Sequence, residues 1–265
     1  MSVETYEVFA VRYARRDAKK GEHFLDPVPD PDLPMPMDYF VWVARSPQRT
    51  VLIDTGFKPE VGARRGRESL RTPSEGLRLI GVDPAAIADI VLTHGHYDHI
   101  GTADAFPNAR LHLQEQELEF IGVRAADQRY RRSFEVEDVL EIVRRRYGGS
   151  LQLHDGAVEL APGLSLHHLG GHTPGLQVVR VRTQRGWVVV ASDASHYYEN
   201  LETDRPFATT YDADRVRQGF RMLGALADSP RHIVPGHDPL VLQRYPAPSP
   251  DLAGIAVRLD AEPAA

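Results

Sequence analysis

The chain has no cysteine, and this absence excludes several kinds of chemistry together. Without thiols the protein forms no disulfide, has no cysteine nucleophile and cannot hold zinc through sulfur. Any metal site must therefore be built from histidine and carboxylate side chains. The sequence offers 12 histidines and 37 aspartates and glutamates for that purpose.

Long apolar runs and an excess of positive charge are also missing. No apolar run approaches the ~18 residues that cross a bilayer, and no long apolar segment follows the charges near the N-terminus, so we expect no membrane span and a cytoplasmic location. Acidic residues outnumber the 31 lysines and arginines, and the formal net charge is -6. Because such a chain repels polyanions, we expect a small-molecule partner and no nucleic acid.

The length of 265 residues and the 42% share of hydrophobic residues are ordinary for a single α/β domain covering 1–265. Strand patterns occur near residues 6–13, 38–44, 50–53, 90–92, 109–113 and 233–234, and a meander of strands is expected over 157–190. Helices are expected within 58–83, after His99 and from about Glu115. The tail from about residue 246 is rich in proline and alanine, and the sequence does not predict its order.

Two further helices follow from apolar residues at helical spacing, which predicts that this face of each helix covers a core. The first set is Val136, Val139, Leu140, Val143 and Tyr147, and the second is Val216, Phe220, Leu223 and Leu226. Arginines near the first helix are interleaved with acidic residues, so we interpret them as a solvated face rather than an anion site. These are Arg129, Arg131, Arg132 and Arg144 to Arg146.

The segment His94-Gly95-His96-Tyr97-Asp98-His99 concentrates metal-ligand chemistry. In an extended backbone, positions 94, 96 and 98 project to the same side, and His99 joins them only if the chain turns there. Four ligands in six residues exceed what one tetrahedral ion takes from one segment, so two ions are predicted. Six other histidines are interpreted as ordinary polar residues: His23, His112, His154, His167, His168 and His232.

This segment resembles the signature of the metallo-β-lactamase superfamily. Four more short motifs follow the family's order: Asp54-Thr55-Gly56, Gly171-His172-Thr173-Pro174-Gly175, Ser192-Asp193 and Pro235-Gly236-His237. The resemblance implies an αββα sandwich with metal ions at one edge of its two sheets. It assigns His94, His96 and His172 to one ion, Asp98, His99 and His237 to the other, and Asp193 to both.

The resemblance also implies the cofactor and the role of Asp54. Two divalent ions are expected, with zinc the first choice and cobalt, manganese or iron as alternatives that the same ligands accept. Asp54 would orient the ligand loop through hydrogen bonds, although an Asp-Thr-Gly segment is also common in simple strand-end turns.

Within the superfamily, the chain most resembles the N-acyl-homoserine lactonases, through its length, Tyr97, the segment FPNARLHLQEQE and Pro235-Gly236-His237-Asp238. This implies opening of a lactone by hydroxide formed on the metals, with Asp98 passing a proton to the leaving oxygen. An apolar groove for an acyl chain would include residues such as Phe106 or Met35. The segment 58–81, which contains Arg64-Arg65-Gly66-Arg67, would cap the site or form a homodimer contact.

Two other functions stay open at this stage. A thioester or other ester hydrolase of the glyoxalase II type uses the same ligands. A binding protein without activity is disfavoured because all seven ligands are present. A β-lactamase of the commonest type is disfavoured because it has a cysteine ligand where this chain has Asp193.

The main departure from the lactonases follows the bridging aspartate. Those enzymes commonly have Asp-Ala-Ser-Tyr there, with the tyrosine hydroxyl reaching the substrate carbonyl, whereas this chain reads Asp193-Ala194-Ser195-His196-Tyr197-Tyr198. Imidazole can donate a hydrogen bond to a developing oxyanion as a phenol does. We therefore expect His196 to face the metals, with Tyr197 or Tyr198 as the alternative donors.

Overall fold

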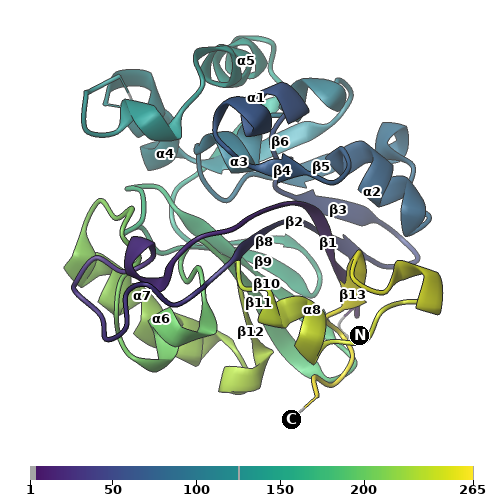
Figure 1. Cartoon of the computed structure of the whole chain (residues 1–265). Coiled ribbons are helices and arrows are strands. Elements are labelled where there is room, and N and C mark those ends of the chain that lie inside the picture. Colours follow the sequence, from purple (N-terminus) through teal and green to yellow (C-terminus); the bar gives the residue numbers. More distant parts are fainter. Residues whose placement is uncertain (1–3, 125, 265) are drawn as a thin grey trace.

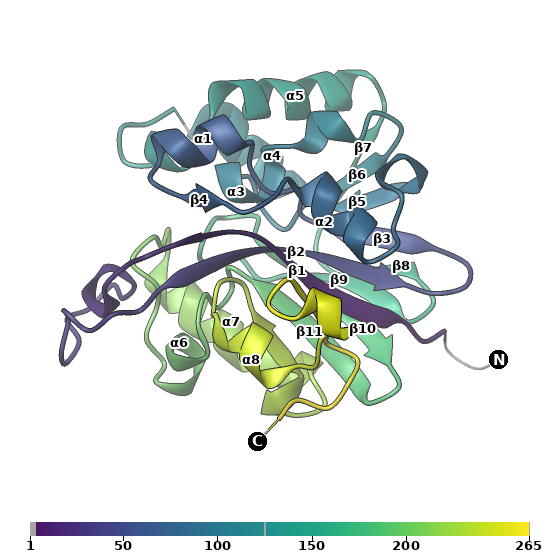
Figure 2. The ribbon, with the colours of Figure 1, turned by 45° about the vertical axis from the view of Figure 1, so that its right-hand side comes forward.

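The computed structural model describes residues 4–124 and 126–264. Two β-sheets lie face to face, with helices on the outer side of each, as the two views in Figures 1 and 2 show. The first sheet has the strand order β13 (Ala256–Arg258), β1 (Glu7–Arg16), β2 (Met37–Arg45), β3 (Thr50–Ile53), β5 (Asp89–Val91), β6 (Arg110–Gln114) and β7 (Leu151–His154), and β4 (Glu68–Ser69) pairs with β1.

The second sheet has the order β12 (Ile233–Pro235), β11 (Gly186–Ser192), β10 (Gln177–Thr183), β9 (Leu164–His168) and β8 (Val158–Ala161). The helices are α1 (Pro59–Arg64), α2 (Pro73–Leu79), α3 (Tyr97–Ile100), α4 (Glu115–Val123), α5 (Val136–Tyr147), α6 (Tyr198–Glu202), α7 (Ala213–Leu226) and α8 (Leu240–Arg244). Short 3₁₀ turns occur at Lys20–Glu22, Pro84–Ala86, Ala103–Ala105, Arg131–Ser133, Pro230–His232 and Pro250–Leu252.

Alternation along the strands explains why the first sheet is buried on both faces. In β2, Phe40 and Trp42 point to the core between the sheets, whereas Tyr39 and Val41 point to the core beneath α1, α2 and α5. A third apolar core lies between the second sheet and α7, and it includes Phe220. The layer order is therefore helix, sheet, sheet, helix, which confirms the predicted αββα sandwich.

The structure corrects two expectations about helices. Helix α5 forms where it was predicted, but Val136 and Tyr147 on the expected apolar face are 73% and 90% exposed. The buried face carries Ile142 together with Asp138 and Arg145. Arg145 is not part of a solvated face, because its guanidinium donates to the backbone carbonyls of four residues in the 103–109 segment.

The tail beyond residue 246 belongs to the first sheet. Strand β13 pairs antiparallel with β1, and Val257 is buried between the two sheets. The backbone amide of Val8 also donates to Asp260 at 3.1 Å. Among the described residues, no helix is both long enough and apolar enough to cross a membrane.

Candidate metal centre

Each predicted ligand follows the end of a strand or lies in a turn beside one. Strands β3 and β5 run parallel in the first sheet, and β11 and β12 run parallel in the second. Their carboxyl ends meet at one edge of the sandwich, which brings Asp54, His94, Asp193 and His237 close together. His172 comes from the turn between β9 and β10.

The turn in the His94–His99 segment comes earlier than we expected. Helix α3 begins at Tyr97, with His96 as its extended N-cap residue. Asp98 is therefore helical, and the expectation that residues 94, 96 and 98 project from one extended strand is wrong for Asp98. Asp98 and His99 therefore come from the first turn of this helix, whereas His94 and His96 come from the segment before it.

The side chains form adjoining groups of possible ligands. The ligand atoms of His94, His96, His172 and Asp193 all lie within 4.8 Å of one another. The same is true of Asp98, His99 and His237, and of a third set made by Asp193, His196 and His237. The structure thus brings together all seven predicted ligands, which we call the ligand cluster, and it adds His196. The six histidines interpreted as ordinary polar residues lie outside these groups.

The arrangement of the imidazoles in the first group fits a cation. Nδ1 of His96 lies 3.0 Å from Nε2 of His94 and 2.9 Å from Nε2 of His172. A neutral imidazole has one N–H donor and one nitrogen lone pair. Hydrogen bonds among the three rings therefore leave some of the converging lone pairs without a donor, whereas one divalent ion can bind a lone pair from each ring. Burial lowers the pKa of His94 and His96 well below its usual value and that of His172 to about 3, so these rings are neutral, as metal ligands must be.

The second group has an excess of negative charge. Burial disfavours the charged form of His99, but the carboxylates of Asp193 and Asp54 raise its pKa well above the usual value. Burial likewise opposes the charge of His237, and Asp193 again raises its pKa. Within the part of the chain that the structure describes, Nε2 of His99 and Oδ1 of Asp193 are buried without a hydrogen-bond partner. These carboxylates and unpartnered atoms fit a divalent cation.

Asp54 fixes the orientation of the cluster from behind. Nδ1 of His99 donates to Oδ2 of Asp54 at 2.7 Å, which directs Nε2 toward the cluster. Asp54 also accepts from the backbone amide of Thr93 at 2.7 Å and from its hydroxyl at 2.8 Å. The backbone of Asp54 has a positive φ of 60°, a conformation that is uncommon outside glycine and that this network holds in place.

Close approach of backbone segments explains the glycine before His237. A Cβ atom at Gly236 would lie 2.8 Å from Oδ1 of Asp193, so a larger residue would displace this carboxylate. His237 is held by a bond from its Nδ1 to the carbonyl of Asp38 at 2.9 Å, which leaves Nε2 free to face Asp193.

Sequence reasoning missed a carboxylate that ties two ligand loops together. Glu117, in the first turn of α4, is buried and accepts from the amides of Gly95 at 2.8 Å and Gly175 at 2.9 Å. These loops carry His94, His96 and His172. The segment FPNARLHLQEQE contains Glu117, but nothing in its local pattern distinguishes this residue from the exposed Glu115 and Glu119.

His196 and the two tyrosines after it lie in different surroundings. His196 lines the pocket over the cluster, with Nε2 3.0 Å from Oδ2 of Asp193. Tyr197 is buried, and its hydroxyl contacts His23 at 3.1 Å and the carbonyl of Pro36 at 3.2 Å. Tyr198 packs in the core between the sheets. Neither tyrosine lines the pocket.

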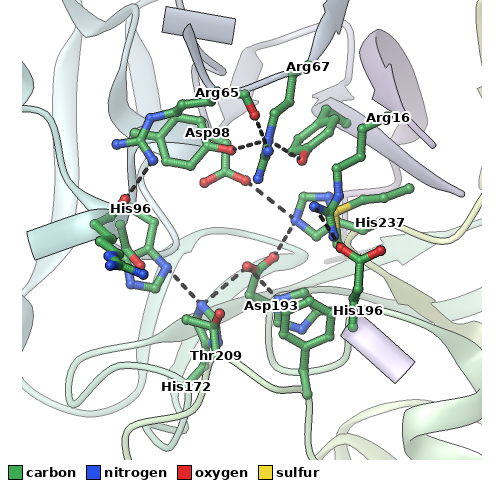
Figure 3. Close-up of a pocket in the computed structure, with 17 residues that line it drawn as sticks. Arg16, Arg65, Arg67, His96, Asp98, His172, Asp193, His196, Thr209 and His237 are labelled. Atoms are coloured by element: carbon green, nitrogen blue, oxygen red, sulfur yellow. Dashed lines mark hydrogen bonds and ion pairs between the residues drawn. The ribbon is translucent and has the colours of Figure 1, made fainter. Parts of the chain in front are cut away.

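The pocket has a volume of about 370 Å³ and a largely polar lining. Figure 3 shows His96, Asp98, His172, Asp193, His196 and His237 around it, with Arg65 and Arg67 above them and Arg16 at the right. Arg132, which is exposed to solvent as expected, also lines this side of the pocket. The segment after α1 thus caps the site through Arg65 and Arg67.

The expected acyl groove is not where we placed it. Phe106 is 2% exposed and belongs to the core beneath the helices, and Met35 packs against that same core. Neither residue lines the pocket. The apolar side chains that do line it are Met37 and Phe207, with Tyr39 and Tyr97 beside them.

Comparison with known proteins gives matches along most of the chain. The sequence model of the metallo-beta-lactamase superfamily matches residues 35–237. An N-acyl homoserine lactonase of Bacillus cereus is 30% identical over 61% of this chain, and the lactonase AiiB of Agrobacterium fabrum is 32% identical over 57%. Each alignment spans 60% of the relative's own length.

Solved structures share the fold over almost the whole chain. An N-acyl homoserine lactone hydrolase with the product N-hexanoyl-L-homoserine at its catalytic metal centre has a TM-score of 0.74 at 21% identity, covering 92% of this chain and 96% of that one. A probable metal-dependent hydrolase from Staphylococcus aureus has a TM-score of 0.76 at 18% identity, covering 100% of this chain and 97% of that one. The two sheets, the strand-end ligands and the matched sequence lead to one conclusion: this chain belongs to the metallo-β-lactamase superfamily.

Proposed function

We propose that this protein is a hydrolase with two divalent metal ions that opens a lactone ring. The observation that carries the proposal is the convergence of all seven predicted ligands in two adjoining groups at a pocket. His94, His96 and His172 would hold one ion, and Asp98, His99 and His237 the other. Asp193 would bridge them, because its two oxygens face different groups, at 3.3 Å from His172 and 3.0 Å from His237.

When bound, the ions supply Lewis acidity and lower the pKa of water far below its bulk value, which provides a nucleophile at neutral pH. The chain's own residues supply position and proton transfer. Asp98 is the proposed proton carrier because its carboxylate, 12% exposed, is the most accessible carboxylate of the cluster. It would pass a proton to the alkoxide that leaves when the ring opens.

His196 is proposed as the donor to the oxyanion that forms on the substrate carbonyl. Its ring stacks on Phe207 with centroids 3.5 Å apart, which fixes the ring plane beside the cluster. Burial lowers the pKa of His196 to about 4, so the ring is neutral and has one N–H. Nε2 faces Asp193 at 3.0 Å, and this N–H would become available to the oxyanion when Asp193 binds the metal ions. Tyr197 and Tyr198 are not given this role, since their hydroxyls are directed elsewhere.

Two lines of support favour an ester bond within a ring as the target. The relatives with the stated matches are named as N-acyl homoserine lactonases. The pocket volume of about 370 Å³ suits a compact substrate. A thioester hydrolase is the second candidate because the same ligand set serves both reactions. Zinc is the proposed metal, with cobalt, manganese and iron as alternatives.

A substrate panel tests the proposal. The metal-loaded protein should open homoserine lactones or other lactones at least about 10-fold faster, in kcat/KM, than it cleaves glutathione thioesters, a difference of about 1.4 kcal/mol in activation free energy. Metal analysis should find about two ions per chain, and a chelator should abolish turnover. Preferential thioester cleavage would select the second candidate, and no metal dependence would reject both.

A further inference from the structure

The side of the pocket opposite the ligand cluster carries four arginines, which we call the arginine wall: Arg16, Arg65, Arg67 and Arg132. They come from separate parts of the chain. Arg16 ends β1, Arg65 and Arg67 follow α1, and Arg132 lies in the 3₁₀ turn Arg131–Ser133. Separate segments thus direct four guanidinium groups into one small cavity, as Figure 3 shows for the three that it labels.

One of these arginines is neutralised within the protein. Arg65 is paired with Glu135 at 2.8 Å, donates to the carbonyls of Arg132 and Phe134, and stacks over the ring of Tyr97 at 4.0 Å. Its charge and most of its N–H donors are used in contacts with neighbouring residues of the protein. Arg65 therefore serves as a support for the other members.

The other three have little or no compensating charge. Nε of Arg67 donates to the hydroxyls of Tyr39 and Tyr97 at 3.1 Å, and Nη1 donates to the carbonyl of Arg65, all uncharged acceptors. Over residues 4–124 and 126–264, no carboxylate lies within ion-pairing distance of Arg67 or Arg132.

Arg16 is only weakly paired. It reaches Glu22 at 3.5 Å, and the side chain of Glu22 is 49% exposed, whereas that of Arg16 is 17% exposed. Nε of Arg16 is buried and, in the described part of the chain, has no hydrogen-bond partner. An isolated cation with an unsatisfied buried donor is costly unless an anionic group completes it.

The carboxylates that line the pocket do not balance the positive charge of these arginines. Besides Glu22, the pocket is lined by Asp98 and Asp193, and the proposed function assigns both to the metal ions. The loaded site would then combine two divalent cations with Arg67 and Arg132, which have no carboxylate partner among the described residues, and with Arg16, which is paired only with the half-exposed Glu22. Such a cavity attracts an anion, and its few apolar side chains, Met37 and Phe207, offer little contact for a long acyl chain.

We infer that the substrate carries a second, anionic group, a carboxylate or a phosphate, that Arg16, Arg67 and Arg132 bind while the ester bond lies over the ligand cluster. The inference rests on the proposed function and narrows it. Guanidinium matches the planar oxygen pairs of both anions, so the wall would select a compact anionic lactone or ester over a neutral one with an apolar chain.

Matched substrates test this inference. The carboxylate of γ-butyrolactone-γ-carboxylic acid is compared with its neutral carboxamide, and γ-(phosphooxymethyl)-γ-butyrolactone with its hydroxymethyl analogue. N-hexanoyl homoserine lactone serves as the neutral substrate with an apolar chain. We expect kcat/KM to be at least about 10-fold higher for one anionic member than for its neutral partner, mainly through KM, and the advantage to shrink as salt is added. The pair with the larger ratio identifies the anion.

Variants test whether the arginine wall causes the preference for anionic substrates. Arg16→Gln and Arg67→Gln should each lower the anionic-to-neutral ratio about 10-fold, and Arg67→Lys should restore part of it because the charge returns. Arg64→Gln is the matched control: Arg64 lies on α1, pairs with Glu135 and does not line the pocket, so its ratio should equal that of the native protein. Metal content is measured in every variant.

The results separate the two proposals. Neutral lactones opened as well as anionic ones, or a ratio unchanged in both glutamine variants, would overturn the inference and leave the proposed function intact. If no lactone or ester is opened, the proposed function fails. Calorimetry then measures binding of the non-hydrolysable tetrahydrofuran-2-carboxylate and of its carboxamide. This tests the anion-binding site independently of any hydrolysis. Binding of the carboxylate that weakens about 10-fold in Arg16→Gln supports the site, and equal binding of both compounds rejects it.

Discussion

The ligand cluster and the arginine wall face each other across one pocket, and they use charge in opposite ways. Asp98 and Asp193 in the cluster, with Asp54 behind it, leave negative charge for cations to balance, and hydrogen bonds orient the rings of His99 and His237. In the wall, Arg67 and Arg132 have no carboxylate partner among the described residues, and Arg16 has only the half-exposed Glu22 at 3.5 Å. The comparison teaches that the two sets of residues come from different parts of the fold. Most of the proposed ligands lie at or just beyond the carboxyl ends of strands, whereas three of the four arginines lie in connecting segments and Arg16 ends β1.

The largest effect should come from breaking the cluster at Asp98. We expect Asp98→Asn to fold normally and to lower lactone turnover by about 10³-fold or more, because it removes a ligand charge and the proposed proton carrier together. Steady-state kinetics with metal analysis measures this. Asp214→Asn, at a carboxylate that is 99% exposed, is the control. Near-native turnover with both metals bound would remove Asp98 from the mechanism.

Removal of one histidine tests whether the cluster holds two separable ions. His172→Ala should reduce the metal content of purified protein from about two ions toward one per chain, because three protein ligands are usual for a tightly held catalytic ion. Elemental analysis after gel filtration gives the count. An unchanged count would show that His172 is not a ligand.

His196 lies beside the cluster, with Nε2 3.0 Å from Asp193. His196→Ala should lower kcat/KM by about 10- to 1000-fold with metal content retained, the range for one lost oxyanion donor. If His196→Ala instead keeps its kcat/KM and Tyr197→Phe or Tyr198→Phe loses it, the role belongs to a tyrosine. Full activity in all three variants would argue against the homoserine-lactone reaction.

The smallest effect concerns a buried carboxyl group, Asp138, that belongs to neither the cluster nor the wall. Burial raises the pKa of Asp138 to about 7 from 3.8, so the folded protein keeps a proton that the unfolded chain loses near pH 4. Stability should therefore fall as pH rises from about 4 to about 7, and Asp138→Asn should remove this loss.

Urea unfolding of the native protein and of Asp138→Asn at pH 5 and pH 8 measures the difference. We expect the variant to be more stable at pH 8, by on the order of 1 kcal/mol, and to have little advantage at pH 5. Asp214→Asn should behave like the native protein at both values. An equal difference at both pH values would show that Asp138 does not titrate in this range.

Sequence patterns predicted many of the strands and helices and drew attention to the His94–His99 motif because both signals are local, whereas the αββα layers followed from the family resemblance. Strands β3 and β11 end directly before Asp54 and Asp193, β12 ends two residues before His237, and spacing within one motif supplies four candidate ligands. The buried face of α5 was not predictable, since Arg145 satisfies its charge through carbonyls that only the fold places nearby. The arginine wall was missed for the same reason, because its members are far apart in sequence.

Strand β13 has a consequence for how the protein can be shortened or fused. It covers the outer edge of β1, and Arg12 near that edge donates to the carbonyl of Gly254 at 2.7 Å. Removal of residues 246–265 would expose a long strand with free amide and carbonyl groups, which is a template for pairing between molecules. A truncated protein would therefore be prone to aggregation even though every metal ligand and every wall arginine is still present.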